Sequence, residues 1–547
     1  MGTSQLAVRD TLAAVVVTAA AFTLYARVEW PWFLLGWVGL VPWLATLDRL
    51  TTVRGALASG LLMSVAFVLG VFGWFAGAIA TYTGLPVLVG VGILLPLAPL
   101  MQPQFIVFAV ARHLARRRGG PGGAAVVGAG VYVGSEWLIG KLFGDTLGHG
   151  FYASVWLRQA ADLAGAPGLT FVLVLFNECV LAGARALGDR DPEHGTRNTE
   201  PGPGRVRRVL VPAALAVGLV AGLLVYGIVR LGELAPAPSE AAPVTVGLVQ
   251  ADISQYGRLA AERGTYDAVR YILDAHAALS ADAFEEAPLD LLLWPETVYP
   301  TTFGHPKSAD GAAFDEELAR FVGVTGVPLV FGAYDVEAGR EFNAAIALSP
   351  AGEGRVAFEA YRKAWLFPLT ERVPVWLDAP WLRAWLPWLG TWTPGGGSRV
   401  LDVTLPDGRS LRLGPLICYD AVDPGIAIEA VRQGAELLAT LSNDSWFAIG
   451  GGPRLHLVVS AFRSLETRRP QVRVTNTGIS AVITPTGEWL ATLGVHARGT
   501  IVKVVAPARG PTTLMVRWGD WFGPTAGVVA LAVLVAWPWF SKFRSQI

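Results

Sequence analysis

The sequence predicts an α-helical membrane domain with several spans, joined to a soluble α/β domain, and three observations predict this class. Long apolar runs fill the first 231 residues, and one more lies near the C-terminus. Only 16% of the 547 residues are charged, below the roughly 25% of ordinary soluble proteins. Residues 243–510 instead alternate short apolar strands with amphipathic helical segments, which is the pattern of an α/β fold.

Eight apolar runs are expected to cross a membrane, because a spanning helix needs about 20 predominantly apolar residues. Seven of them form the expected membrane domain, residues 1–231, and the eighth forms the expected C-terminal transmembrane helix, residues 523–541. The seven runs lie near residues 8–27, 32–47, 55–79, 85–112, 123–141, 164–184 and 209–231.

Basic residues gather in alternate loops between these runs, and cytoplasmic loops of membrane proteins carry such an excess of Lys and Arg. The basic set is Arg9, Arg49, Arg54, Arg112, Arg116, Arg117, Arg118, Arg185, Arg190, Arg197, Arg205, Arg207, Arg208, Lys542 and Arg544. The pattern predicts that both termini lie in the cytoplasm. With seven spans before it, the soluble domain 243–510 is expected on the outer side.

The soluble domain is expected to begin after a Pro/Ala-rich linker, residues 231–243. Expected strands lie at 244–250, 289–296, 327–336, 342–350, 409–420, 437–444, 471–478 and 480–485, and expected helices at 258–284, 312–323, 424–434 and 454–467. In such folds the reactive groups usually follow the carboxyl ends of strands.

Charge and cysteine content exclude several classes of partner. The formal net charge is zero, so no nucleic-acid partner is expected. The two cysteines, Cys179 and Cys418, lie in very different contexts, and no Cys/His spacing typical of a metal site is present. We therefore expect neither a disulfide framework, nor a metal, nor a cofactor.

Three residues at or near expected strand ends, Glu296, Lys363 and Cys418, could together carry chemistry. A carboxylate can take the proton of a thiol, and a cation can stabilise both the thiolate and an oxyanion. A helix beginning near Pro424 would add its positive end close to Cys418. Singly, each residue has an ordinary structural explanation, as a core cysteine, a solvated strand end or a surface lysine. Together they indicate acyl transfer or amide hydrolysis.

The order Glu, Lys, Cys and the motifs around it resemble the nitrilase, or carbon–nitrogen hydrolase, superfamily and, within it, the apolipoprotein N-acyltransferase family. The matching motifs are "LLLWPET", "YRKAWLFPLTERVP", "LICYD", "LSNDSWF" and "RRPQVRVTNTGISAVITPTGEWL", with "SEWL" and "RQAADLAGAPGLTFVLVLFN" in the membrane part. The resemblance covers nearly the whole chain. It implies a nitrilase-like α-β-β-α sandwich for residues 243–510, on the outer side of a bacterial cytoplasmic membrane.

The resemblance also implies a ping-pong acyltransferase. Cys418 would be the nucleophile that takes an acyl chain from a membrane phospholipid as a thioester. The acceptor would be the α-amine of the diacylglyceryl-modified N-terminal cysteine of an apolipoprotein. Glu296 would act as the general base, and Lys363 would stabilise the oxyanion.

Five further residues are expected to support the site because of where they lie in these motifs: Glu371, Tyr419, Asp420, Asn443 and Trp446. Glu371 matches a glutamate that the family needs near the active site. At Asp420 the family usually has glutamate, so the role of this residue stays open. His456 matches a common histidine position and is interpreted as structural.

A tryptophan-rich stretch, residues 373–392, separates Lys363 from Cys418 and includes Trp376, Trp381, Trp385 and Trp388. Aromatic rings favour the membrane interface, so this stretch is expected to form a mobile arm that touches lipid. The alternative is a packed hydrophobic loop.

Two other classes of function stay open. A membrane-anchored, nitrilase-like amidase acting on a soluble or other lipid substrate would use the same three residues, but it leaves the large membrane domain unexplained. A non-catalytic membrane scaffold leaves the order Glu, Lys, Cys as a coincidence.

Overall fold

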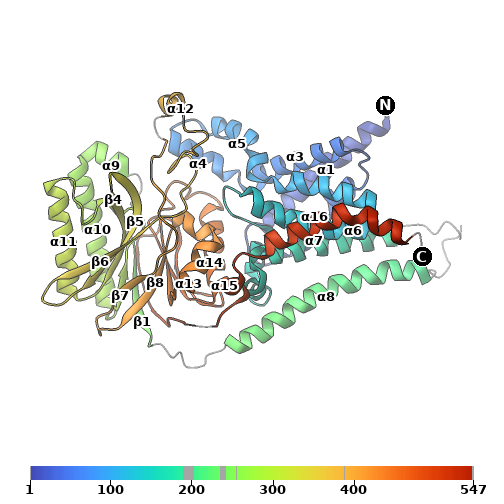
Figure 1. The fold of residues 1–547 in the computed structure, drawn as a ribbon. Helices are drawn as coiled ribbons and strands as arrows, with labels where there is room; N and C mark the ends of the chain where they lie inside the picture. The colour runs from blue at the N-terminus through green and yellow to red at the C-terminus, as the bar shows by residue number, and fades with distance from the viewer. Residues whose placement is uncertain are drawn as a thin grey trace. The chain divides into compact units, whose positions relative to one another are not determined.

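The computed structural model describes residues 2–188, 203–234, 242–253, 256–386, 389–509 and 511–544. The chain divides into two compact units, one made of Met1–Glu233 with Asp520–Ile547 and the other of Leu234–Gly519. In the described residues, the first unit consists of helices and the second carries two β-sheets (Figure 1).

The helices of the first unit are apolar and mostly long. Five helices of its described part are long and apolar enough to cross a membrane: Val8–Tyr25, Val53–Val71, Gln104–Ile139, Leu157–Gly188 and Val206–Leu234. The pair Trp74–Thr83 and Val87–Met101, bent by 119° at its break, is apolar enough to be either one broken span or a re-entrant loop. Trp32–Leu47 and Phe522–Ala536 are shorter apolar segments. The expected helical membrane domain with several spans is confirmed.

The labelled helices of this unit are α1 (Gly2–Tyr25), α2 (Val41–Leu47), α3 (Val53–Val71), α4 (Trp74–Thr83), α5 (Val87–Met101), α6 (Gln104–Ile139), α7 (Ala161–Gly188), α8 (Pro203–Leu234) and α16 (Phe522–Arg544). The run expected as one span, 85–112, is divided between α5 and α6. The physical reason is Pro103, because a proline disfavours helical backbone at the preceding residue. Accordingly, Gln102 has φ −133° and ψ 60°.

A buried ion cluster joins α6 and α7 to the end of α2. Arg112 on α6 donates to both oxygens of Glu178 on α7, over 2.5 and 2.8 Å, and to Asp48 Oδ1 over 2.6 Å. The three side chains are almost completely buried. Removing one partner of such a cluster leaves an uncompensated buried charge, so the cluster fixes the packing of these helices.

The second unit contains a seven-stranded sheet, with the order β13-β1-β2-β4-β5-β6 and β3 paired to β4, and a six-stranded sheet, with the order β12-β11-β10-β9-β8-β7. The strands are β1 (Val244–Gln250), β2 (Leu291–Leu293), β3 (Tyr299–Thr302), β4 (Leu329–Glu337), β5 (Arg340–Pro350), β6 (Val356–Arg362), β7 (Leu401–Thr404), β8 (Ser410–Ile417), β9 (Leu437–Ser442), β10 (Gln471–Thr475), β11 (Ser480–Ile483), β12 (Trp489–Leu493) and β13 (Gly499–Val505). In each sheet the central strands are parallel and the outer pairs are antiparallel.

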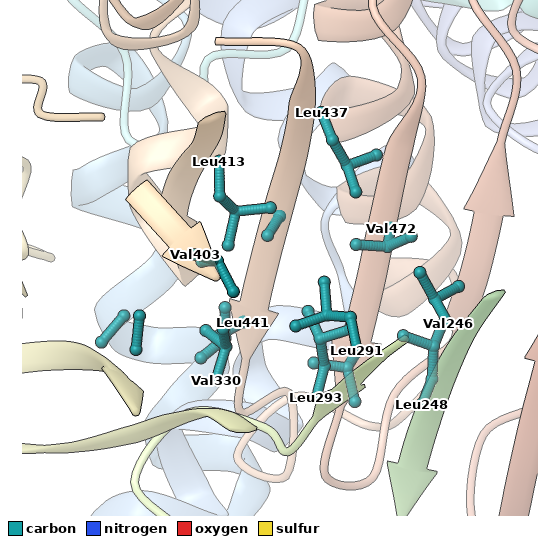
Figure 2. Close-up of a cluster of buried hydrophobic side chains, with 14 of the residues drawn as sticks. Val246, Leu248, Leu291, Leu293, Val330, Val403, Leu413, Leu437, Leu441 and Val472 are labelled. Atoms are coloured by element: carbon teal, nitrogen blue, oxygen red, sulfur yellow. The ribbon is translucent and has the colours of Figure 1, made fainter. Parts of the chain in front are cut away.

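The two sheets face each other across one apolar core. Figure 2 shows side chains from the seven-stranded sheet, such as Val246, Leu293 and Val330, facing side chains from the six-stranded sheet, such as Leu413 and Val472. These side chains are completely buried. Close packing of both inner faces therefore fixes the two sheets as one sandwich.

Helices cover the two outer faces of the sandwich (Figure 1). On the seven-stranded sheet, α10 (Thr265–Glu286) and α11 (Ala309–Thr325) pack through Ile272 and Phe314. On the six-stranded sheet, α13 (Pro424–Arg432) packs through Ala427 and Val431. The remaining helices of the unit are α9 (Tyr256–Arg263), α12 (Pro380–Trp385), α14 (Gly452–Thr467) and α15 (Leu514–Trp518). The expected α-β-β-α sandwich is confirmed.

Candidate active site

The predicted residues Glu296, Lys363 and Cys418 come together near the carboxyl ends of three strands. Glu296 lies three residues after β2, while Lys363 and Cys418 directly follow β6 and β8. Since β2 and β6 belong to one sheet and β8 to the other, the site forms where the two sheets meet. All three side chains are buried, with exposed fractions of 6%, 2% and 8%.

Glu296 is held by three donors. Lys363 Nζ and Asn343 Nδ2 donate to its Oε1 over 3.1 and 2.8 Å, and the backbone N–H of Asn443 donates to its Oε2 over 2.9 Å. Gly332 on β4 makes this position possible, because a Cβ there would lie 2.5 Å from Glu296 Cα. Both oxygens of the carboxylate are therefore fixed in place by hydrogen bonds.

Lys363 lies between two carboxylates. Its Nζ is 3.1 Å from Glu296 Oε1 and 2.7 Å from Glu371 Oε1. Burial alone would lower the pKa of Lys363, but the two carboxylates outweigh it and hold that pKa well above its usual range. Glu371 is itself fixed by the backbone N–H of Phe367, which donates to Oε2 over 2.6 Å. Lys363 is therefore a permanent positive charge in the site.

Cys418 stands at a sharp turn of the backbone. Its φ is 48°, in the left-handed region, where the chain passes from β8 into a 3₁₀ turn, Cys418–Val422. Burial raises the pKa of the Cys418 thiol, the Glu296 carboxylate raises it further, and Lys363 lowers it only in part. The thiol is thus protonated at neutral pH and needs a base, for which Glu296, whose charge acts on the thiol, is the candidate.

Asp420 ties the strand that carries Cys418 to the segment that carries Lys363. Its Oδ2 accepts from the Tyr361 hydroxyl over 2.8 Å and from the Ile417 N–H over 3.0 Å. Its Oδ1 accepts from the N–H groups of Ala364 and Trp365 over 3.2 and 2.7 Å. Burial raises the pKa of Asp420 to about 6. This residue, whose role the sequence left open, is a buried link between the two chain segments.

His456 contacts the backbone of the predicted nucleophile, Cys418. Its Nε2 is 3.3 Å from the carbonyl oxygen of Cys418, and its Nδ1 is 3.1 Å from Asp444 Oδ1. Burial would raise the pKa of Asp444, but Arg473 and His456 hold it well below its usual range. This geometry agrees with the structural interpretation of His456.

The same group of residues bears on metal binding. Cys418, Asp444 and His456 each offer one ligand atom, and these atoms lie within 4.8 Å of one another. However, Arg473 Nη2 lies 2.9 Å from Asp444 Oδ2 and 3.0 Å from His456 Nδ1. A guanidinium in contact with two of the three groups disfavours a divalent cation there.

Aromatic rings line the region beside the charged residues. The Phe367 ring contacts both Tyr419 and Trp446, with centroids 5.0 Å apart in each case. The structure thus brings the two predicted aromatic residues into contact with one phenylalanine. The side chain of Asn443 is directed to the backbone of Ser445, so Asn443 serves Glu296 through its backbone.

In the tryptophan-rich stretch, residues 373–392, several leucines are buried or half-buried, whereas three tryptophans are exposed. Val373, Leu382 and Leu389 form a small buried cluster, with Leu369, Leu377 and Leu386 packed against it. In contrast, Trp376, Trp381 and Trp385 have exposed fractions of 84%, 65% and 73%. Trp388, the fourth predicted residue, lies outside the described residues. The stretch therefore exposes large apolar rings around a small buried cluster.

Asn343 is a residue that the sequence reasoning missed. It lies on β5, is 5% exposed, and donates from Nδ2 to Glu296 Oε1 over 2.8 Å and to Glu371 Oε1 over 3.3 Å. Its backbone carbonyl also accepts from the N–H of Lys363 over 2.8 Å. The available signal was a polar residue within an apolar strand, "FNAAIALSP", since a buried polar group requires partners.

Comparison with known proteins gives two matching family models. Residues 245–510 match the carbon-nitrogen hydrolase model, and residues 16–179 match the model of the apolipoprotein N-acyltransferase N-terminal domain. Among curated proteins, the apolipoprotein N-acyltransferase of Geobacter metallireducens is 28% identical over 92% of this chain and 90% of its own length. That of Bradyrhizobium diazoefficiens is 32% identical over 74% of this chain and 71% of its own length.

Proposed function

The chain belongs to the apolipoprotein N-acyltransferase family, and from this premise we propose that it transfers an acyl chain from a membrane phospholipid to a lipoprotein. The acceptor is the α-amine of the diacylglyceryl-modified N-terminal cysteine. The observation that carries the proposal is the meeting of Glu296, Lys363 and Cys418 in one buried site. The apolar helices of the same chain would keep that site beside substrates whose acyl chains stay in the bilayer.

In the first half-reaction Glu296 takes the proton of the Cys418 thiol, and the sulfur attacks the ester carbonyl of the phospholipid. The positive charge of Lys363 stabilises the oxyanion that develops. The carbon–oxygen bond of the ester then breaks, and the leaving alkoxide receives the proton from Glu296. The products are a thioester on Cys418 and a lysophospholipid.

In the second half-reaction the neutral amine of the acceptor attacks the thioester carbonyl. Glu296 takes one proton from the attacking nitrogen, the carbon–sulfur bond breaks, and that proton passes to the sulfur. An amide has formed on the acceptor, and the Cys418 thiol is regenerated. One carboxylate thus serves both half-reactions, which suits a site where each leaving group needs the proton that its nucleophile released.

Two features support a site that works at a membrane surface. The exposed rings of Trp376, Trp381 and Trp385 match the preference of tryptophan for the interface between lipid and water, so we assign them to lipid contact. The loop charges support a catalytic unit on the outer side of the cytoplasmic membrane, with both termini inside. This orientation brings the thiol to the leaflet that would hold both substrates.

The thioester tests the proposed function. Full-length protein in detergent–phospholipid micelles is incubated with a phospholipid labelled in its acyl chain, and a labelled adduct that hydroxylamine releases is expected on the protein. The Cys418→Ala variant should carry no adduct, while Cys179→Ala, which removes the other cysteine, should carry as much as the wild type. An adduct that persists in Cys418→Ala would overturn the mechanism.

A diacylglyceryl peptide added to the labelled protein separates acyl transfer from the amidase alternative. We expect the label to move to the peptide nitrogen, as seen by mass spectrometry of its N-terminus. Release of the label only as free fatty acid would instead indicate a hydrolase.

A further inference from the structure

In the side-chain amide of Asn343, the nitrogen is hydrogen-bonded, whereas the oxygen has no hydrogen-bond partner in the described part of the chain. Its Nδ2 has two hydrogens, and two acceptors lie within reach, Glu296 Oε1 at 2.8 Å and Glu371 Oε1 at 3.3 Å. Its Oδ1 is buried and has no hydrogen-bond partner within the described part of the chain. A buried acceptor without a donor costs folding free energy, so this arrangement calls for an explanation.

The orientation of the amide follows from the charges around it. Exchanging its oxygen and nitrogen would turn the oxygen toward two carboxylate oxygens and would remove both hydrogen bonds. The backbone of Asn343 is fixed as well, because its carbonyl accepts a hydrogen bond from the N–H of Lys363 over 2.8 Å. Oδ1 is therefore held facing away from the carboxylates.

The distances allow Oδ1 to reach the amine nitrogen from which Glu296 takes a proton. In a planar amide the nitrogen and oxygen are about 2.3 Å apart, so Oδ1 lies no more than about 5 Å from Glu296 Oε1. Two hydrogen bonds of about 2.9 Å each can span that separation. One nitrogen atom can then donate to Glu296 and to Asn343 at the same time.

We propose that Asn343 Oδ1 accepts the second N–H of the acceptor amine and so selects a primary amine in the second half-reaction. This inference rests on the proposed function. As the amine attacks the thioester, one of its hydrogens is directed to Glu296, which removes it, and the other stays on nitrogen and is bonded to Asn343. That second hydrogen becomes the N–H of the amide product. The bonds formed and broken are those of the proposed transfer, and no further reactant is needed.

The test compares two acceptors on the full-length enzyme. One is a peptide with an S-diacylglyceryl N-terminal cysteine, and the other is the same peptide methylated once on its α-nitrogen, which as a neutral amine has a single N–H. We expect the wild type to prefer the primary amine at least tenfold in kcat/KM. In Asn343→Leu the preference should shrink to within about threefold, and the KM for the primary amine should rise.

Acyl-enzyme formation is measured alongside, because it uses Glu296 but no amine. A variant that slows acyl-enzyme formation and amine transfer equally, with the preference between the two amines unchanged, would make Asn343 a support for Glu296 alone and overturn the proposal. Should Asn343→Leu not fold, equal use of the two acceptors by the wild type would overturn it as well. Absence of an acyl-enzyme in the wild type would contradict the proposed function instead.

Asn476→Leu is the matched control. Asn476 is also a buried asparagine of the same unit, and its amide bonds to the backbone of Ile253 rather than to the carboxylates. Its loss should lower the melting temperature and leave the preference between the two acceptors at the wild-type value.

Discussion

Each unit of the molecule contains a buried cluster in which a cation lies between two carboxylates. In the helical unit, Arg112 lies between Asp48 and Glu178. In the sandwich unit, Lys363 lies between Glu296 and Glu371.

The helical cluster has an excess of positive groups, whereas the sandwich cluster has an excess of negative groups. Arg116 and Arg185 also pair with Asp48, so the helical cluster has more cations than carboxylates. The sandwich cluster has two carboxylates for one lysine, and a thiol lies near them. A site with an excess of carboxylate retains a group that can take a proton, whereas the helical cluster has none to spare. The first arrangement suits catalysis and the second suits packing.

The largest effect is expected from neutralising the base. Glu296→Gln keeps the size of the side chain but removes its basic oxygen, so thioester formation should fall about 10²–10⁴-fold. Glu178→Gln makes the same chemical change in the helical cluster and should alter the activity per folded molecule less than about threefold. Rates of labelled acyl-enzyme formation measure both. Comparable losses in the two variants would contradict the division into a catalytic and a packing cluster.

For stability we expect the opposite: loss of the cation should destabilise the protein more in the helical cluster than in the sandwich cluster. Arg112→Leu would leave Glu178 in the interior without its cation, while Asp48 keeps Arg116 and Arg185; loss of one partner costs about 3–5 kcal/mol in comparable buried pairs. We expect its melting temperature in detergent to fall by several degrees. Lys363→Met should abolish most activity and change the melting temperature less, because two hydrogen-bond donors of Glu296 remain. A melting temperature lowered more by Lys363→Met would reverse this assignment.

An intermediate effect is expected at Asp420. Asp420→Asn replaces an acceptor of four hydrogen bonds by an amide that must turn an N–H toward at least one donor, which is unfavourable in the interior. Thioester formation should fall about 10–100-fold because Cys418 and Lys363 lose their link. Asp423→Asn is the matched control, since Asp423 caps α13 through the N–H of Gly425. Its rate should stay within about threefold of the wild type.

The pH dependence of Cys418 tests the electrostatics of the sandwich cluster. Because burial and Glu296 raise the pKa of the thiol, the thiolate fraction should keep increasing above the usual cysteine pKa of about 8.5. In a Cys179→Ala background, iodoacetamide should therefore modify Cys418 about tenfold faster for each unit between pH 7 and pH 9.5. A plateau below pH 8 would mean that Lys363 outweighs burial and that the resting nucleophile is a thiolate.

The smallest effect is expected at the exposed tryptophans. Replacing Trp381 and Trp385 by serine should reduce phospholipid turnover several-fold and leave attack on a short, soluble thioester nearly unchanged. The buried cluster of Val373, Leu382 and Leu389 stays intact in this variant, so the segment keeps its support. Equal losses on both substrates would argue against lipid contact.

The sequence alone predicted the elements with strong apolar patterns. β1 and β9 are buried along nearly their whole length, so they appear as the mainly apolar runs typical of parallel strands in a covered sheet. β7 and β12 alternate buried or half-buried residues with exposed ones, and they were not expected because such short edge strands resemble loops. The division of residues 85–112 was also missed, because the four prolines of this apolar run do not lower its hydropathy enough to mark a break.

Motifs and strand ends in the sequence determined which residues to consider, because a nucleophile, a base and a cation of suitable type follow strands in the right order. Only the tertiary structure decided which hydrogen-bond partners these residues have. Asn343 lies 47 residues from Glu296, and its role appears only once β5 is placed beside β4. Asp420 likewise acquires its function from Tyr361, Ala364 and Trp365, which are distant in sequence. Hydrogen bonds depend on positions in space, and the spacing of residues along the chain does not encode them.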